Sequence, residues 1–102
     1  MGFADNLRNE LKSQNEQFIA THYEPRKEEI FRIISSGIKR IGYVRVDVFN
    51  NTGTAEGDML GIRSGTEINA FAEFLDKEGF RTRKAWWGYS SDGDPDMLTI
   101  TV

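Results

Sequence analysis

The chain has 102 residues, the size of one domain, and its 38% hydrophobic and 28% charged residues are ordinary for a globular protein with its own core. It contains no cysteine, which excludes disulfides, thiol nucleophiles and cysteine-ligated zinc, and which fits a reducing cytoplasm. The net charge of −3 weighs mildly against nucleic-acid binding, and no apolar run approaches the roughly 20 residues that cross a bilayer.

The N-terminal residues 3–22 are predicted to form an amphipathic helix with a narrow apolar stripe. Its apolar residues recur at near-helical spacing and are Phe3, Leu7, Leu11, Phe18 and Ile19. So narrow a stripe is closer to a coiled-coil seam than to a helix sunk in a core. We expect the helix to lie across the sheet or a neighbouring helix. The alternative, a separable arm over residues 1–23 that pairs with a second copy, stays open.

A second helix is predicted to follow a break at Pro25, because proline lacks the amide donor that a helix interior needs. We expect this helix to end near Gly37. Its apolar face is broad and consists of Ile30, Ile33, Ile34 and Ile38. These isoleucines are expected to pack on the strand that comes next.

The stretch 42–49, GYVRVDVF, is predicted to be a strand with two different faces, because successive side chains alternate across a strand. Val44, Val46 and Val48 form the face that must be buried. The opposite face carries Tyr43, Arg45, Asp47 and Phe49. A mixture of aromatic and charged side chains suits a contact surface better than it suits a dry core.

The glycine-rich residues 50–65 are predicted to be a loop or a weak hairpin, in which 58–62 could add a short strand. Ser64 and Glu67 then fit a capping box, S-x-x-E, that starts another helix. That helix has a strong apolar face and is expected to end at Gly79.

The C-terminal part is predicted to contain two strands, Phe80–Trp87 and Met97–Val102, with Leu98, Ile100 and Val102 facing the core. The whole pattern predicts a single α+β domain over residues 1–102. Its architecture is a two-layer sandwich with a mainly antiparallel sheet of three to four strands and two to three helices, in the order α-α-β-α-β-β.

A contact face is predicted where the strand over 80–87 and the strand over 42–49 lie together. Adjacent tryptophans in a regular strand point in opposite directions, so we expect one to fill the core and the other to lie on the open face or at an edge. The candidate protein-binding residues are Tyr43, Arg45, Phe49, Arg83, Trp86 and Trp87. The simpler alternative is that a helix or a second subunit covers this face.

A second candidate site is the start of the helix after residue 62. Exposed backbone donors and the positive helix end could hold an anion there, with the side chains of Arg63, Ser64 and Thr66 around Gly65. Ordinary helix capping explains the same residues.

Two further clusters are weaker. Asp92, Asp94 and Asp96 alternate as at the start of a calcium loop, but the glycine and glutamate of such a loop are missing, so a turn is favoured and no metal is predicted. His22 is the only histidine and has no catalytic partner in the pattern. No cofactor is implied, and the chain leans away from being an enzyme.

These observations favour a small non-catalytic binding or regulatory protein, working through protein contacts, as a homodimer or with a larger partner. The first alternative is a small anionic ligand or nucleotide binder that uses residues 63–66 and a tryptophan. The second is a single-stranded nucleic-acid binder that uses Arg45, Arg81, Arg83 and a tryptophan. No membrane association is expected.

Overall fold

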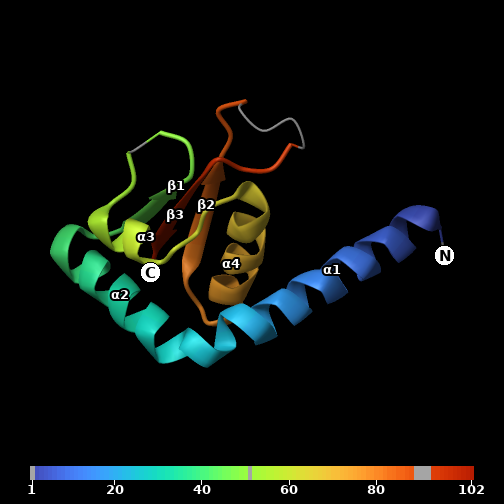
Figure 1. Cartoon of the computed structure of the whole chain (residues 1–102), viewed down its shortest axis with the longest axis horizontal. Coiled ribbons are helices and arrows are strands. Elements are labelled where there is room, and N and C mark those ends of the chain that lie inside the picture. Colours follow the sequence, from blue (N-terminus) through green and yellow to red (C-terminus); the bar gives the residue numbers. More distant parts are fainter. Residues whose placement is uncertain (1, 51, 89–92) are drawn as a thin grey trace.

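The fold is described by a computed structural model for residues 2–50, 52–88 and 93–102 (Figure 1). In chain order the elements are α1 (Phe3–His22), the 3-10 helix η1 (Glu24–Arg26), α2 (Lys27–Ile41), β1 (Val44–Asp47), α3 (Ala55–Met59), α4 (Gly65–Lys77), β2 (Arg81–Ala85) and β3 (Met97–Thr101). The predicted α+β class and the order α-α-β-α-β-β are confirmed, with the short α3 as an addition.

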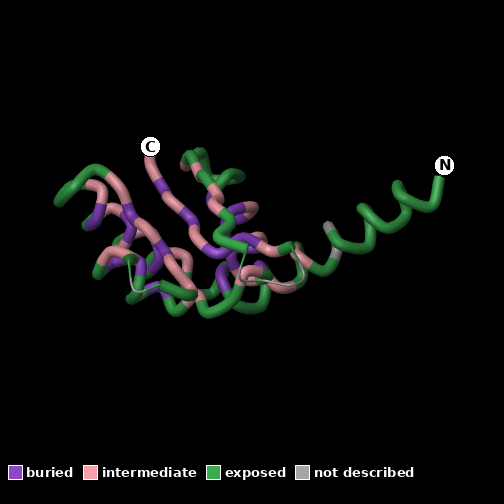
Figure 2. The backbone as a smooth tube through the Cα atoms, turned by 90° about the horizontal axis from the view of Figure 1, so that it is seen from above, coloured by how far each residue is buried: buried purple, intermediate pink, exposed green. Residues whose placement is uncertain are grey.

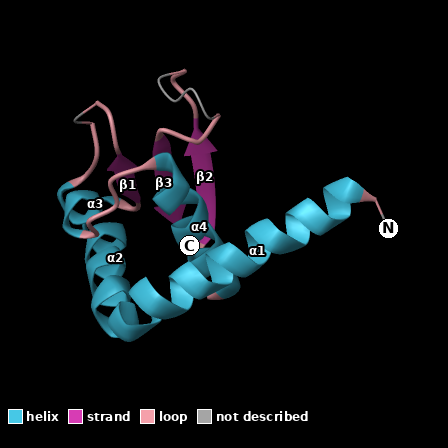
Figure 3. Ribbon diagram, turned by 45° about the vertical axis from the view of Figure 1, so that its right-hand side comes forward, coloured by secondary structure: helices cyan, strands magenta, loops and turns pink. Residues whose placement is uncertain are grey.

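The described strands form one antiparallel sheet in the order β1-β3-β2, with β3 in the centre. Val44 lies opposite Ile100 and Val46 opposite Leu98, and all four are buried. Helices α2 and α4 pack against this face of the sheet (Figure 3). The predicted burial is therefore confirmed for Val44 and Val46, whereas Val48, beyond the end of β1, is only partly buried. Val102, predicted to face the core, is exposed.

The core lies between the sheet and these helices. Its buried hydrophobic residues are Ile19, Tyr23, Ile30, Ile34, Val44, Val46, Leu60, Ile68, Ala70, Phe71, Ala72, Phe74, Leu75, Leu98 and Ile100. Six of them come from α4, whose start at Ser64 and left-handed end at Gly79 both agree with the sequence. The Ser64 hydroxyl accepts the Glu67 amide, as a helix N-cap requires.

Helix α1 is anchored only by its second half. Ile19 and Tyr23 are buried, and the Tyr23 ring packs edge-on against Phe71 at 5.0 Å between centroids. Burial also raises the pKa of the Tyr23 hydroxyl. The first half extends away from the body (Figure 2), and Phe3 is 82% exposed. Helix α1 thus contacts α4 and leaves the far face of the sheet uncovered.

The predicted end of the second helix at Gly37 is wrong, because α2 continues to Ile41. It stops at Gly42, whose backbone is left-handed with φ of 90°, a conformation that favours glycine. Gly37 has another role. A Cβ atom there would lie 2.5 Å from the Val44 side chain, so the missing side chain lets α2 approach β1 closely.

The predicted loop, hairpin or short strand over residues 50–65 is corrected to a region that contains the helix α3. Thr54 caps it by accepting the amide of Gly57 at 3.1 Å. Thr54 also bonds to the outer edge of β1: its backbone amide donates to the Arg45 carbonyl at 2.9 Å, and its hydroxyl accepts the Arg45 amide at 3.1 Å. The edge of β1 is therefore covered.

An ion pair joins α3 to α2. The guanidinium of Arg40 donates to both carboxylate oxygens of Glu56, with a shortest distance of 2.6 Å. Glu56 is 7% exposed, so its charge needs this partner. The hydrogen bonds from Arg40 hold the pKa of Glu56 below its ordinary value.

We predict that Gly57→Ala destabilises the protein by about 2 kcal/mol, although alanine is the better helix former. The new Cβ would fall on the carbonyl oxygen of Arg45, so α3 or β1 must shift. Urea denaturation measures the change in the free energy of unfolding. Gly2→Ala adds the same methyl group in open space and is the control. A Gly57→Ala variant as stable as the wild type would contradict this packing.

Candidate functional site

The sheet presents a second face, on the side away from α2 and α4. We call it the open face, and it consists of Arg45, Asp47, Arg81, Arg83, Ala85, Met97, Thr99 and Thr101. The register sets these residues in rows across the strands. Arg45 of β1, Thr99 of β3 and Arg83 of β2 form the central row. All of these side chains are half-buried or exposed, so the face is accessible.

Positive charge concentrates on this face. The three arginines Arg45, Arg81 and Arg83 and the carboxylate of Asp47 give the open face a net charge of +2. The net charge of the whole chain is −3, so the rest of the chain carries −5. Among the described residues no carboxylate pairs with any of the three arginines. Their charges are therefore available to an anionic partner.

Arg45 is the most constrained of the three. Its guanidinium lies 5.1 Å from the centre of the Tyr43 ring, within the range of a cation–π contact. Its Nε is buried and, in the described part of the chain, has no hydrogen-bond partner. A buried donor without an acceptor costs free energy, so this position of Arg45 is held at some cost to stability.

Asp47 organises the loop that follows β1. Its carboxylate accepts the backbone amides of Phe49 at 3.0 Å and Asn50 at 2.8 Å, and also the Thr52 hydroxyl. Partial burial opposes ionisation, but these hydrogen bonds outweigh it and hold the pKa of Asp47 below its ordinary value. The loop places Phe49, which is 54% exposed, just beyond the end of the open face.

The prediction that one tryptophan fills the core is wrong, since Trp86 is 57% and Trp87 is 49% exposed. Strand β2 ends at Ala85, so strand alternation does not govern either ring. Trp86 donates its indole N–H to the Gly93 carbonyl at 3.0 Å. The backbone amide of Trp87 donates to the fully buried carboxylate of Asp96 at 2.6 Å.

The Trp87 ring borders the open face. A hollow of about 470 Å³ is lined there by Arg45, Asn50, Thr52, Trp87 and Met97. The structure thus brings Tyr43, Arg45, Arg83 and Trp87 to one surface, with Phe49 at its margin. The Trp86 indole is instead hydrogen-bonded to the Gly93 carbonyl.

The second candidate site, at the start of α4, is already engaged by the chain's own carboxylates. Thr66 donates to Asp94 at 3.1 Å, and the Arg63 amide donates to Glu67 at 2.7 Å. A Cβ on Gly65 would lie 2.5 Å from the Pro95 carbonyl oxygen. Anion binding at residues 63–66 stays a prediction, but these contacts fit the capping explanation.

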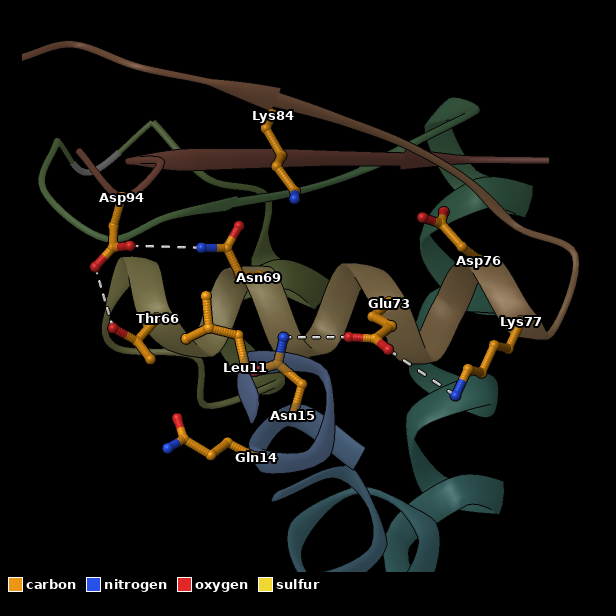
Figure 4. Close-up of a pocket in the computed structure, with 10 residues that line it drawn as sticks. All are labelled: Leu11, Gln14, Asn15, Thr66, Asn69, Glu73, Asp76, Lys77, Lys84 and Asp94. Atoms are coloured by element: carbon orange, nitrogen blue, oxygen red, sulfur yellow. Dashed lines mark hydrogen bonds and ion pairs between the residues drawn. The ribbon is translucent and has the colours of Figure 1, made fainter. Parts of the chain in front are cut away.

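Sequence reasoning missed a cleft of about 770 Å³ between α1, α4 and β2, which is lined mostly by polar and charged residues (Figure 4). Lys84 points into it from β2, while Asn15 of α1 donates to Glu73 of α4 at 3.2 Å across it. Leu11 lies on its wall. Strand alternation puts Lys84 on the same face of the sheet as the buried Val46 and Leu98. A charged residue on that face was the only sequence signal, and it does not reveal a cleft.

The weaker clusters form no site in the described residues. Asp92 lies outside them, Asp94 bonds to Thr66 and Asn69, and Asp96 accepts the backbone amide of Trp87. No group of three potential metal ligands occurs in the described residues. His22 packs against Phe18 with ring centroids 4.3 Å apart. None of the helices described has the length and apolarity to span a membrane.

Comparisons with known proteins add nothing to this geometry, because no family model, curated protein or solved structure matches the chain. The functional argument therefore rests on the residues of the open face.

We predict that Asp47 titrates below its ordinary pKa of about 4 and that Thr52→Val, which removes one hydrogen bond, raises that pKa. Because the folded pKa is lowered, the stabilisation from Asp47 is complete above the unfolded pKa and is lost as the pH falls through the folded value. Carboxyl NMR titration measures the pKa. Urea denaturation of wild type and Asp47→Asn should converge in acid, and curves that stay parallel would oppose the assignment.

Proposed function

We propose that this chain is a small non-catalytic binding protein that contacts another protein through the open face. The observation that carries the proposal is a set of arginines on the side of the sheet that the helices leave uncovered, flanked by Tyr43 and Trp87. These arginines have no ion-pair partner among the residues that the structure describes. Arginine, tyrosine and tryptophan are the residues that most often dominate the energy of protein interfaces.

The rigidity of the face supports this function. Its residues stand on strands, so their backbone is ordered before a partner arrives, and little conformational entropy remains to be lost. Arg45 is further held by the Tyr43 ring, and its Nε lacks an acceptor in the described structure.

We also propose, as finer features, a regulatory role in the cytoplasm and self-association. Two open faces packed on each other would place arginines against arginines, which is unfavourable. The exposed stripe of α1, which consists of Phe3, Leu7 and Leu11, is the better surface for a homodimer. Isolated helices of this length are marginal in water, so an extended first half of α1 would gain order from such a contact.

Single-stranded nucleic acid is the second candidate for the open face. Three arginines beside an exposed tryptophan can bind phosphates and stack on a base. The net charge of −3 opposes it through long-range repulsion. Its diagnostic would be a steep loss of affinity with salt.

We predict that peptides selected by display on the wild-type protein lose at least about tenfold in affinity for Arg83→Glu and Arg45→Glu, because a favourable charge contact becomes repulsive. Fluorescence anisotropy measures the dissociation constant. Arg32→Glu makes the same charge change on an exposed residue of α2 and is the matched control. Selected peptides that bind both open-face variants normally would place the interaction elsewhere.

We predict that Leu7→Asp abolishes concentration-dependent dimerisation in analytical ultracentrifugation, because it puts a charge in the centre of the exposed stripe. The fold should be retained, since Leu7 is 45% exposed. Asn9→Asp adds a negative charge to the same projecting half of α1, outside the stripe, and is the control. A wild-type protein that sediments as a monomer at all concentrations would end the homodimer proposal and leave the open face untouched.

A further inference from the structure

The two edges of the sheet differ. Strand β1 is closed by the segment before and within α3: Thr54 bonds to both backbone groups of Arg45, and Gly57 lies against the Arg45 carbonyl oxygen. Strand β2 pairs with β3 on one side only. Within the described residues, no hydrogen bond reaches the far side of β2 from any other element.

An open edge offers a row of backbone donors and acceptors to any extended chain that fits beside it. In β2 the side chains along this row are strongly cationic, with the sequence Arg-Thr-Arg-Lys-Ala over residues 81–85. Arg81 and Arg83 lie on the open face, and Lys84 points from the other face into the cleft next to α1. In the part of the chain that is described, none of the three has an ion-pair partner.

The charge pattern of β2 favours some binding partners at this edge over others. An antiparallel pair of β2 strands from two copies, centred on Arg83, would set Arg83 directly opposite its own copy, and like charges opposite each other destabilise a sheet. The edge thus disfavours a second copy of itself. An extended segment with carboxylates would instead face Arg81 and Arg83 on one side and Lys84 on the other.

We propose that β2 accepts an acidic, extended segment of another protein as a fourth strand of the sheet. This proposal rests on the proposed function and names the partner's chemistry and its mode of binding. Backbone hydrogen bonds to the edge supply alignment, and carboxylates at alternate positions pair with the arginines of the open face. The covered edge of β1 leaves this as the accessible edge in the described structure.

The test uses the full chain and a fluorescein-labelled peptide, Glu-Val-Glu-Val-Glu-Val-Glu. We expect saturable binding by anisotropy and a loss of at least about tenfold for Arg83→Glu but not for Arg32→Glu. Hydrogen exchange followed by NMR should show new protection at β2 amides that point away from β3. A peptide N-methylated at alternate residues should bind in one methylation frame and fail in the other, because only one set of amides faces β2.

The outcomes separate this inference from the proposed function. Peptide binding without protection at β2, or equal binding of both N-methylated frames, would overturn strand addition while a protein-binding face remains. Binding of an oligo-dT strand but not of the peptide would overturn both in favour of nucleic acid. No binding of the acidic peptide, while display selects other peptides that depend on Arg45, would overturn the acidic strand alone.

Discussion

The carbonyl oxygen of Arg45 lies where a side chain on residue 57 would have to be, and this close approach determines how the sheet ends on that side. Because residue 57 is glycine, α3 can lie directly on the edge of β1, with Thr54 bonded to the strand backbone. The ion pair of Arg40 and Glu56 then ties α3 to α2. At Gly37 the absence of a side chain lets α2 reach the same strand. One edge is closed by this junction, and in the described part of the chain no comparable contact closes the other edge.

Charge is also distributed unevenly, between the helical side of the molecule and the open face of the sheet. The helical side carries most of the acidic residues, and some of them are paired, as Lys27 is with Glu78 at 2.7 Å. The arginines of the open face have no such partners among the described residues. A chain that is acidic overall thus presents a cationic sheet surface. The negative net charge of the chain would repel anions at long range, whereas the arginines of the open face would attract them at short range. Together these effects would favour partners that fit the face over anions in general.

Local sequence signals predicted the elements whose stability is local. The helix α1 matches the predicted residues 3–22, and the capping residue Ser64 marks the start of α4. The helix α3 could not be predicted, because its polar, glycine-rich sequence has no apolar period and its position depends on contacts with β1. Gly37 was misleading for a related reason, since a glycine required for packing looks the same in sequence as one that ends a helix.

The open face could be predicted in part. Alternation from Val44 placed Tyr43 and Arg45 on the side away from the core, and the register then added Arg83. Alternation failed for the tryptophans, because it assumes that β2 continues beyond Ala85. The cleft beside Lys84 is formed by α1 crossing α4, a tertiary arrangement that no local pattern encodes.

The way in which α1 is anchored has a practical consequence. About eight residues of α1 precede Leu11, which lies on the cleft wall beside α4, and at 1.5 Å per residue they span about 12 Å. A fluorophore or fusion partner attached ahead of Phe3 would therefore be held away from the body as if on a short rod. Such an attachment leaves the open face and the edge of β2 unobstructed, so the N-terminal end suits immobilisation for binding measurements at those two surfaces, although not for measurements of self-association through α1.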